Sequence, residues 1–463
     1  MTNNTTLTME NPLGVQKISK LFLKFALPSV VAMVVSSLYN VVDQIFIGLG
    51  VGFLGNGATN VSFPFVTICL AISLLIGVGS ATLFSLSLGK NEEETASKVV
   101  LTSLIFSIII GILYTVLAEI FVTPLLLLFG STKDILPYAV DYVVYSAIGF
   151  PFLIYTNVSC NLIRADGSPR YSMICMLIGA VVNTILDPIF IFALNMGVKG
   201  AAIATTISQI ISFIPAFLYL FKFKLAKINL KKITINFKIF IKSISLGASN
   251  CLNQLAMLLV QIVMNNSLAY YGELSKFGSD IPLSAFGVAI KINSIFISVF
   301  IGINQGTQPI IGYNYGAKKF DRVKQAYKIS IIYCAVISLV AFITFQTIPK
   351  QLVSLFGSGN ALYMEFAVMV MKTFLFTILI NGVQLVSANF FASIGKPVKG
   401  IILTLSRQCF FFIPILLILP VFFGINGICY TAPLSDVLSF SLTMTFIFIE
   451  FKKLKTSESY QHC

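Results

Sequence analysis

Charged side chains are scarce in this sequence of 463 residues: Asp, Glu, Lys and Arg make up 10% of it, while 57% is hydrophobic. Soluble globular domains usually carry about 25% charged residues, so the composition excludes that class. Long apolar runs instead predict an all-α polytopic membrane protein. Residues 1–12 are polar and the first apolar run is too long for a signal-peptide core, so we expect no cleaved leader.

Histidine is nearly absent, and cysteine follows no recognisable pattern. The single histidine, His462, lies in the C-terminal tail, which leaves no material for a His-based metal centre. The eight cysteines are scattered singly without a CxxC, so we expect reduced, small apolar side chains. No Ser–His or His–acid pattern occurs, and this argues against an intramembrane enzyme.

About twelve apolar spans are present. They lie at 21–48, 58–88, 98–121, 138–163, 171–195, 200–222, 238–271, 283–314, 326–348, 362–393, 400–421 and 426–450. Several exceed the roughly 20 residues that a bilayer requires, so these helices are expected to tilt or to extend past the interface.

Basic residues concentrate in alternate loops, the pattern that orients a membrane protein. The richest are the links 222–242 and 318–328, with smaller groups after spans 4 and 10 and in the C-terminal tail. This pattern predicts that both termini are cytoplasmic. It also accounts for the formal net charge of +14 without a nucleic-acid partner.

The two halves share landmarks at a constant spacing. Leu128–Ser131 recurs as Leu355–Ser358, and Gly197–Gly200 corresponds to Gly424–Gly427, each 227 residues later. This predicts two parallel six-helix repeats, forming two pseudo-symmetric lobes around a central cavity. We expect an N-lobe at 21–222, a cytoplasmic linker at 223–237 and a C-lobe at 238–450, with cytoplasmic segments at 1–20 and 451–463.

Two carboxylates lie well inside apolar spans, Asp43 in span 1 and Asp187 in span 5. A carboxylate there costs about 2.5–3.5 kcal/mol on insertion scales, so both must face protein or water. Asn183 shares a helix face with Asp187, and Thr205 lies on the next span. These oxygen donors suit Na⁺, and two desolvated carboxylates close together could instead hold H⁺. The structural alternatives are that Asn183 and Thr205 only link helices, and that Asp187 caps or kinks a helix before Pro188.

Other polar residues within the spans are candidate substrate contacts. They are Tyr39, Asn40, Asn157, Gln209 and Asp436. Asp436 corresponds to Gln209 in the repeat and could equally be a polar contact inside the C-lobe. Aromatic faces, amides and a carboxylate suit planar cationic amphiphiles. Gly77–Gly79 and Gly302 are candidate hinges.

Several short motifs follow one another along the chain. They are Pro28 followed by Val42–Gly48, the Leu88-Gly89 loop with Glu92–Glu94, Arg164–Pro169, Asn183-x-x-x-Asp187-Pro188, and Gly197-x-x-Gly200-Ala201-Ala202. In this order, the motifs resemble the multidrug and toxic compound extrusion (MATE) family over nearly the whole chain. Asp43, Asn183, Asp187 and Thr205 match the positions of the family's N-lobe cation site, which is a metal site only if the ion is Na⁺.

The resemblance, closest to the bacterial multidrug branch, implies a multi-pass transporter of the bacterial inner (cell) membrane. It would export amphipathic, often cationic drugs and dyes in exchange for H⁺ or Na⁺, with no cofactor besides the coupling ion, and a monomer would suffice. Spans 7 and 10 carry neutral amides where some relatives have acids, so coupling is expected in the N-lobe.

Two alternatives remain open from the sequence. A lipid-linked oligosaccharide flippase of the same superfamily would need cationic side chains in its cavity. Lys291, Lys372 and Arg407 are almost the only basic residues within the predicted spans. A passive channel is the other alternative, although acids buried in one lobe of a two-lobe repeat favour alternating access.

Overall fold

Helices are the only regular elements in residues 11–226, 228, 235–355 and 361–459, which the computed structural model describes. The first half contains α1 (Pro12–Val15), α2 (Ile18–Val51), α3 (Phe53–Gly89), α4 (Glu93–Ile120), α5 (Val122–Leu128), α6 (Leu136–Ala147), α7 (Phe150–Ala165), α8 (Pro169–Pro188), the π-helix η1 (Ile189–Ala193), α9 (Gly197–Leu218) and the 3₁₀-helix η2 (Tyr219–Lys222).

The second half repeats this order. It contains α10 (Phe237–Glu273), α11 (Asp280–Gly316), α12 (Phe320–Thr347), α13 (Pro349–Ser354), α14 (Ala361–Met369), the π-helices η3 (Val370–Phe374) and η4 (Ser406–Phe412), and α15 (Ile378–Ser393), α16 (Pro397–Leu405), α17 (Ile413–Phe423) and α18 (Ile425–Ser459).

The predicted all-α membrane fold is confirmed. Ten helices of the described residues are long and apolar enough to cross a membrane, or up to twelve when each of two bent pairs counts as one span. Many large apolar side chains on these helices are exposed, as lipid contact requires. Among them are Ile109, Ile112 and Leu113 on α4 and Phe422 on α17.

The internal repeat is visible in the geometry. Helices α4 and α12 both have 28 residues, and they start at Glu93 and Phe320, positions 227 residues apart. Each half also contains one helix pair bent by 52°. Gly167 and Gly395 occupy equivalent turns with φ of +84° and +77°, a conformation that glycine adopts at little cost. The second copy of the Leu-Phe-Gly-Ser landmark, Leu355–Ser358, lies mostly outside the described residues.

Two spans expected to be single helices, 138–163 and 362–393, are bent instead. In the first, Gly149 separates α6 from α7, and Pro151 follows at the second position of α7. Proline cannot donate to the carbonyl four residues earlier and clashes with it, so the helix axis changes direction here. In the second, the π-helix η3 ends at Phe374 and the chain restarts as a helix at Ile378.

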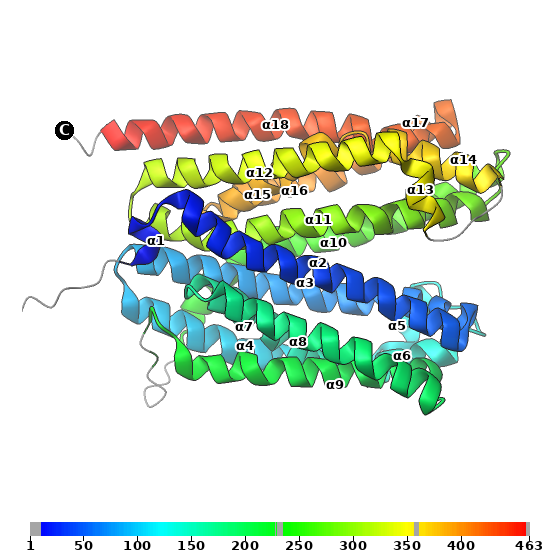
Figure 1. Cartoon of the computed structure of the whole chain (residues 1–463), viewed down its shortest axis with the longest axis horizontal. Coiled ribbons are helices and arrows are strands. Elements are labelled where there is room, and N and C mark those ends of the chain that lie inside the picture. Colours follow the sequence, from blue (N-terminus) through cyan, green and yellow to red (C-terminus); the bar gives the residue numbers. More distant parts are fainter. Residues whose placement is uncertain (1–10, 227, 229–234, 356–360, 460–463) are drawn as a thin grey trace, which may run out of the picture.

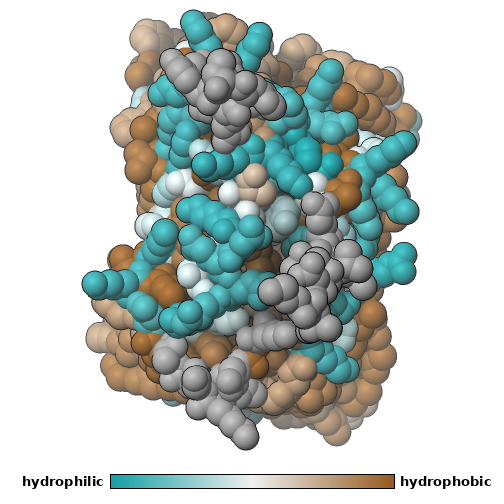
Figure 2. Space-filling view, turned by 90° about the vertical axis from the view of Figure 1, so that its left-hand side faces the viewer, coloured by the Kyte–Doolittle hydropathy of each residue, from teal (hydrophilic) through white to brown (hydrophobic). Residues whose placement is uncertain are grey.

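The two halves form two lobes that meet at one end of the bundle. We call this the terminal end, because α1 and the last turns of α18 lie there (Figure 1). From it, α2 and α3 diverge from α10 and α11 toward the opposite end. Figure 2 views the terminal end and shows hydrophilic residues gathered on it, with hydrophobic residues along the flanks.

Close backbone contacts between the lobes depend on glycine. A Cβ at Gly79 of α3 would overlap the carbonyl oxygen of Ser243 on α10. A Cβ at Gly302 of α11 would lie 2.5 Å from the Cα of Val30 on α2. Buried Gln308 of α11 adds a polar link, because its Nε2 donates to the Val78 carbonyl (2.9 Å). Both candidate hinge stretches thus lie at interfaces between helices, inside unbroken helices.

Candidate cation site and inter-lobe pocket

A buried polar cluster lies within the first lobe, where α8 packs against α2 and α9. Asp187 is 0% exposed and Asn183 is 2% exposed. Asn183 Nδ2 donates to Asp187 Oδ1 at 3.0 Å and to Thr205 Oγ1 at 3.3 Å. The structure therefore brings together the three predicted residues of α8 and α9, and Asp43 of α2 adjoins Asp187.

Three oxygens of this cluster have no hydrogen-bond donor. They are Asp43 Oδ1, Asp187 Oδ2 and Asn183 Oδ1, all buried. Buried acceptors without a donor are costly, and two adjacent carboxylates repel each other. A Na⁺ bound by the three oxygens would offset both costs, and a proton shared between the carboxylates would satisfy their two oxygens and reduce the repulsion.

The local sequence explains how α8 presents these groups. Asn183 and Asp187 are one turn apart on the same face. Pro188 lacks an N–H, and the π-helix η1 begins directly after it. A π-turn widens the helix next to Asp187 and is common at functional sites. Pro188 was expected to disturb the helix; it is the last residue of α8, and the chain continues directly as the π-helix η1.

Two tyrosines accompany the acids. Tyr39 lies one turn before Asp43 on α2 and faces both carboxylates. Tyr142 of α6 faces the same group and packs against Ile47, Ile191 and Ala201. Tyr142 was not predicted from the sequence, because nothing in its span separates it from the other tyrosines. Only the bend between α6 and α7 and the packing of α6 on α9 bring it to the site.

The other predicted substrate contacts have varied surroundings. Asn40 is exposed and donates from Nδ2 to the Ser36 carbonyl on its own helix. Asn157 makes the same kind of bond to the Leu153 carbonyl at 2.9 Å. Gln209 Oε1 is buried without a donor. Their contact with substrate stays a prediction.

Asp436 belongs to a polar network inside the second lobe. It is 2% exposed; Arg407 Nε donates to its Oδ1 at 2.9 Å, and Thr377 Oγ1 donates to its Oδ2 at 2.7 Å. Arg407 also donates to Asn381 Oδ1, and Gln384 Nε2 to the Asp436 carbonyl at 2.7 Å. The network joins α15, η4 and α18 beside the bend before Ile378.

We expect Asp436→Leu to lower the unfolding temperature of the detergent-solubilised protein. Removing one partner of a buried ion pair costs up to about 3–5 kcal/mol, and the 27% exposure of the Arg407 side chain reduces this cost. The double variant Arg407→Met, Asp436→Leu should recover most of the loss, because it leaves no uncompensated charge. Equal unfolding temperatures for the single and the double variant would contradict the ion pair.

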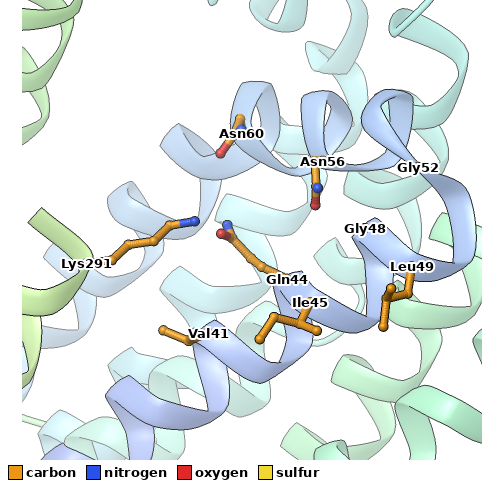
Figure 3. Close-up of a pocket in the computed structure, with 9 residues that line it drawn as sticks. All are labelled: Val41, Gln44, Ile45, Gly48, Leu49, Gly52, Asn56, Asn60 and Lys291. Atoms are coloured by element: carbon orange, nitrogen blue, oxygen red, sulfur yellow. The ribbon is translucent and has the colours of Figure 1, made fainter. Parts of the chain in front are cut away.

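A separate pocket lies between the lobes, with a cavity volume of about 500 Å³. Residues of α2, α3 and α11 line it, among them Val41, Gln44, Ile45, Asn56, Asn60 and Lys291 (Figure 3). It lies toward the opposite end from the contacts at Gly79 and Gly302. The molecule is therefore closed at the terminal end and hollow between the lobes beyond it.

Comparison with known proteins identifies the family. The MatE family model matches residues 28–189 and 248–418, one segment in each half. The chain belongs to the MatE family. It is therefore a membrane transporter and not an enzyme, and the predicted resemblance is confirmed.

Individual relatives agree with this assignment. The multidrug export protein MepA of Staphylococcus aureus (strain MRSA252) is 26% identical over 431 residues, which cover 93% of each chain. MepA of Staphylococcus haemolyticus (strain JCSC1435) is 26% identical over 436 residues, again with 93% coverage of each.

Solved structures share the fold of this MatE protein. An outward-facing multidrug resistance MATE transporter of the MOP superfamily superposes with a TM-score of 0.90 at 23% identity, covering 96% of this chain and 98% of the other. A MOP superfamily transporter from Pyrococcus furiosus gives the same TM-score and coverage at 22% identity.

Proposed function

We propose that this MatE transporter exports amphipathic, often cationic compounds in exchange for H⁺ or Na⁺. The observation that carries the proposal is the buried cluster of Asp43, Asn183 and Asp187, in which three oxygens lack a donor. It lies inside one lobe of a molecule whose lobes are closed at one end only. The names of the MepA relatives, multidrug export proteins, support the same substrate class.

The distribution of charge supports one orientation in the membrane. The end of η2 and the starts of α10 and α12, which carry or adjoin the described basic residues of the links 222–242 and 318–328, lie at the terminal end (Figure 1), where hydrophilic residues gather (Figure 2). Cytoplasmic loops are rich in Lys and Arg, so we place both termini in the cytoplasm of a bacterial inner membrane. The closed end then faces inward, and the pocket faces outward. One chain contains both lobes, so a monomer is sufficient for transport.

Exchange follows from competition for the carboxylates. In the outward-facing form, uptake of H⁺ or Na⁺ neutralises the Asp43–Asp187 pair and lowers its affinity for a cationic drug, which leaves. In the inward-facing form, release of the ion restores the charge and the drug affinity. Thermodynamic linkage makes the two effects reciprocal. A cycle that moves one net positive charge inward through about 100 mV gains about 2.3 kcal/mol, enough for a drug gradient of roughly fifty-fold. Exchange of one ion for a drug with a single positive charge moves no net charge, so that cycle depends on the concentration gradient of the ion.

Ethidium efflux from cells that express the wild-type protein tests this function and identifies the coupling ion. We expect efflux that exceeds the efflux from cells with the empty vector. Collapsing the proton gradient with an uncoupler should stop efflux if H⁺ is the ion, whereas replacing Na⁺ with choline should stop it if Na⁺ is. Efflux equal to the vector control with every dye tested, while the protein reaches the membrane, would overturn the proposal.

A further inference from the structure

The inter-lobe pocket begins one turn beyond a hydrogen bond between α2 and α11. The last polar link between these helices joins the hydroxyls of Ser37 and Ser294 at 3.2 Å. One turn farther from the terminal end, Val41 of α2 and Lys291 of α11 line the pocket instead. The Ser37–Ser294 link therefore lies at the inner end of the pocket.

Among the residues that the structure describes, the polar side chains of the pocket have no protein partners. Lys291, Gln44, Asn56 and Asn60 point into the same space from three helices (Figure 3). Within the described ranges, none of these four side chains forms a hydrogen bond or an ion pair, and the only charged residue that lines the pocket is Lys291. The pocket is thus positively charged and carries three amide groups free to donate.

A lysine in a membrane span usually extends to the interface. Lys291 is eleven residues beyond Asp280, the first residue of α11, or about 16 Å along the helix axis. Its side chain extends into the space between the lobes, toward Gln44 and Asn60 (Figure 3). The Lys291 side chain does not run along α11 to the interface. Its charge is therefore available to a ligand in the pocket.

The opposite part of the lining is apolar. Val41 and Ile45, one turn apart on α2, form a hydrophobic surface beside the amides. A ligand that fits this lining has a hydrophobic body and an anionic group, because a cation would meet Lys291 with nothing to offset the repulsion. An ammonium-bearing ligand fits only if it also carries an anion.

We propose that this pocket binds the anionic group of amphipathic substrates, with Lys291 as the counter-charge and Gln44, Asn56 and Asn60 as hydrogen-bond donors. The inference rests on the proposed export function and adds to its substrate class amphiphiles that carry a carboxylate or a similar anion, zwitterions included. Cations without an anionic group would depend on the carboxylates of the first lobe alone. An anionic lipid headgroup has the same chemistry and is the other possible occupant.

The test compares two dyes that differ in one group. Rhodamine 110 carries a free carboxylate, and rhodamine 123 is its methyl ester. Fluorescence anisotropy titrations with the purified protein in phosphatidylcholine nanodiscs give the affinity ratio of acid to ester for wild type, Lys291→Met and Lys291→Arg. Lys372→Met is the matched control, since Lys372 is also an exposed lysine on a membrane helix but does not line the pocket.

We expect Lys291→Met to lower the acid-to-ester affinity ratio at least about fivefold, the effect of one charge pair in a water-filled site. Lys291→Arg and Lys372→Met should keep the wild-type ratio. The same ratio in wild type and Lys291→Met would overturn the proposal. If nanodiscs with phosphatidylglycerol abolish the acid preference of wild type while Lys291→Met is unaffected, the occupant is a lipid headgroup, and anionic amphiphiles are not added to the substrate class.

Failure of this inference is distinguishable from failure of the export function. The affinity ratio is measured on purified protein without any gradient, whereas export is measured as ethidium efflux. Ethidium carries no anionic group, so its efflux does not depend on an anion site. A protein that exports ethidium but shows no role for Lys291 retains the export function and loses only the anion site.

Discussion

Asp187→Asn is expected to reduce ethidium efflux at least about tenfold, which corresponds to a rise of about 1.4 kcal/mol in the effective barrier to transport. Asn has nearly the shape of Asp but neither ionises nor takes up a proton. Asp187 is fully buried and its Oδ2 has no donor, and its replacement leaves Asp43 as the one carboxylate of the cluster. Asp43→Asn should have the same effect, because either change leaves a single carboxylate. The measurement is the initial efflux rate from preloaded cells, normalised to the amount of protein in the membrane.

Glu93→Gln provides the matched control. Glu93 is an exposed carboxylate at the start of α4, and its loss should leave the efflux rate unchanged. The unfolding temperature of the purified Asp187→Asn protein separates lost coupling from misfolding. If the ion is Na⁺, adding it should raise the unfolding temperature of wild type but not of the variant, since a bound ligand stabilises the folded state. Normal efflux by both Asp variants would place coupling elsewhere in the protein.

The candidate site was largely predictable because of the cost of burial in a membrane. A carboxylate inside a long apolar run is costly unless it faces protein or water, and such residues are usually functional. Asp43 and Asp187 can therefore be selected from the sequence alone. Helical spacing then adds Asn183. The same logic cannot select Tyr142, since a tyrosine costs little in a helix that is partly exposed to lipid. The pocket around Lys291 was equally hidden, because α2, α3 and α11 meet only through the arrangement of the lobes.

The fold shows the same division between local and long-range information. Hydrophobic runs located all the spans, because hydropathy is a property of each segment alone. The bends of 52° and the π-helices η1, η3 and η4 depend on how adjacent helices pack, and only Pro151 and Pro188 signal two of them in the sequence. Gly79 and Gly302 were expected to act as hinges. In this conformation they lie inside unbroken helices, where the absence of a side chain permits contact between the lobes.

Gly79→Val should therefore open the terminal end. A side chain at residue 79 would collide with the Ser243 carbonyl, and a backbone cannot yield as a flexible side chain does. Overpacking of this kind costs about 1–3 kcal/mol. The cost falls only on the conformation in which the lobes touch here, so the ratio of terminally open to closed molecules should rise about 5- to 150-fold. The Gln308–Val78 hydrogen bond, which crosses the same interface, would be lost in the open form.

The opening can be measured as a distance between spin labels at residues 93 and 321, exposed positions in the first turns of α4 and α12 on different lobes. The native cysteines would first be replaced. We expect a longer distance to dominate in Gly79→Val and the short distance to dominate in wild type. Gly287→Ala is the control, because a Cβ there meets nothing within 4 Å. An unchanged distance in Gly79→Val, with a normal unfolding temperature, would show that the lobes tolerate a side chain at this contact. The closure of the terminal end would then have to rest on other contacts, such as those at Gly302 and Gln308.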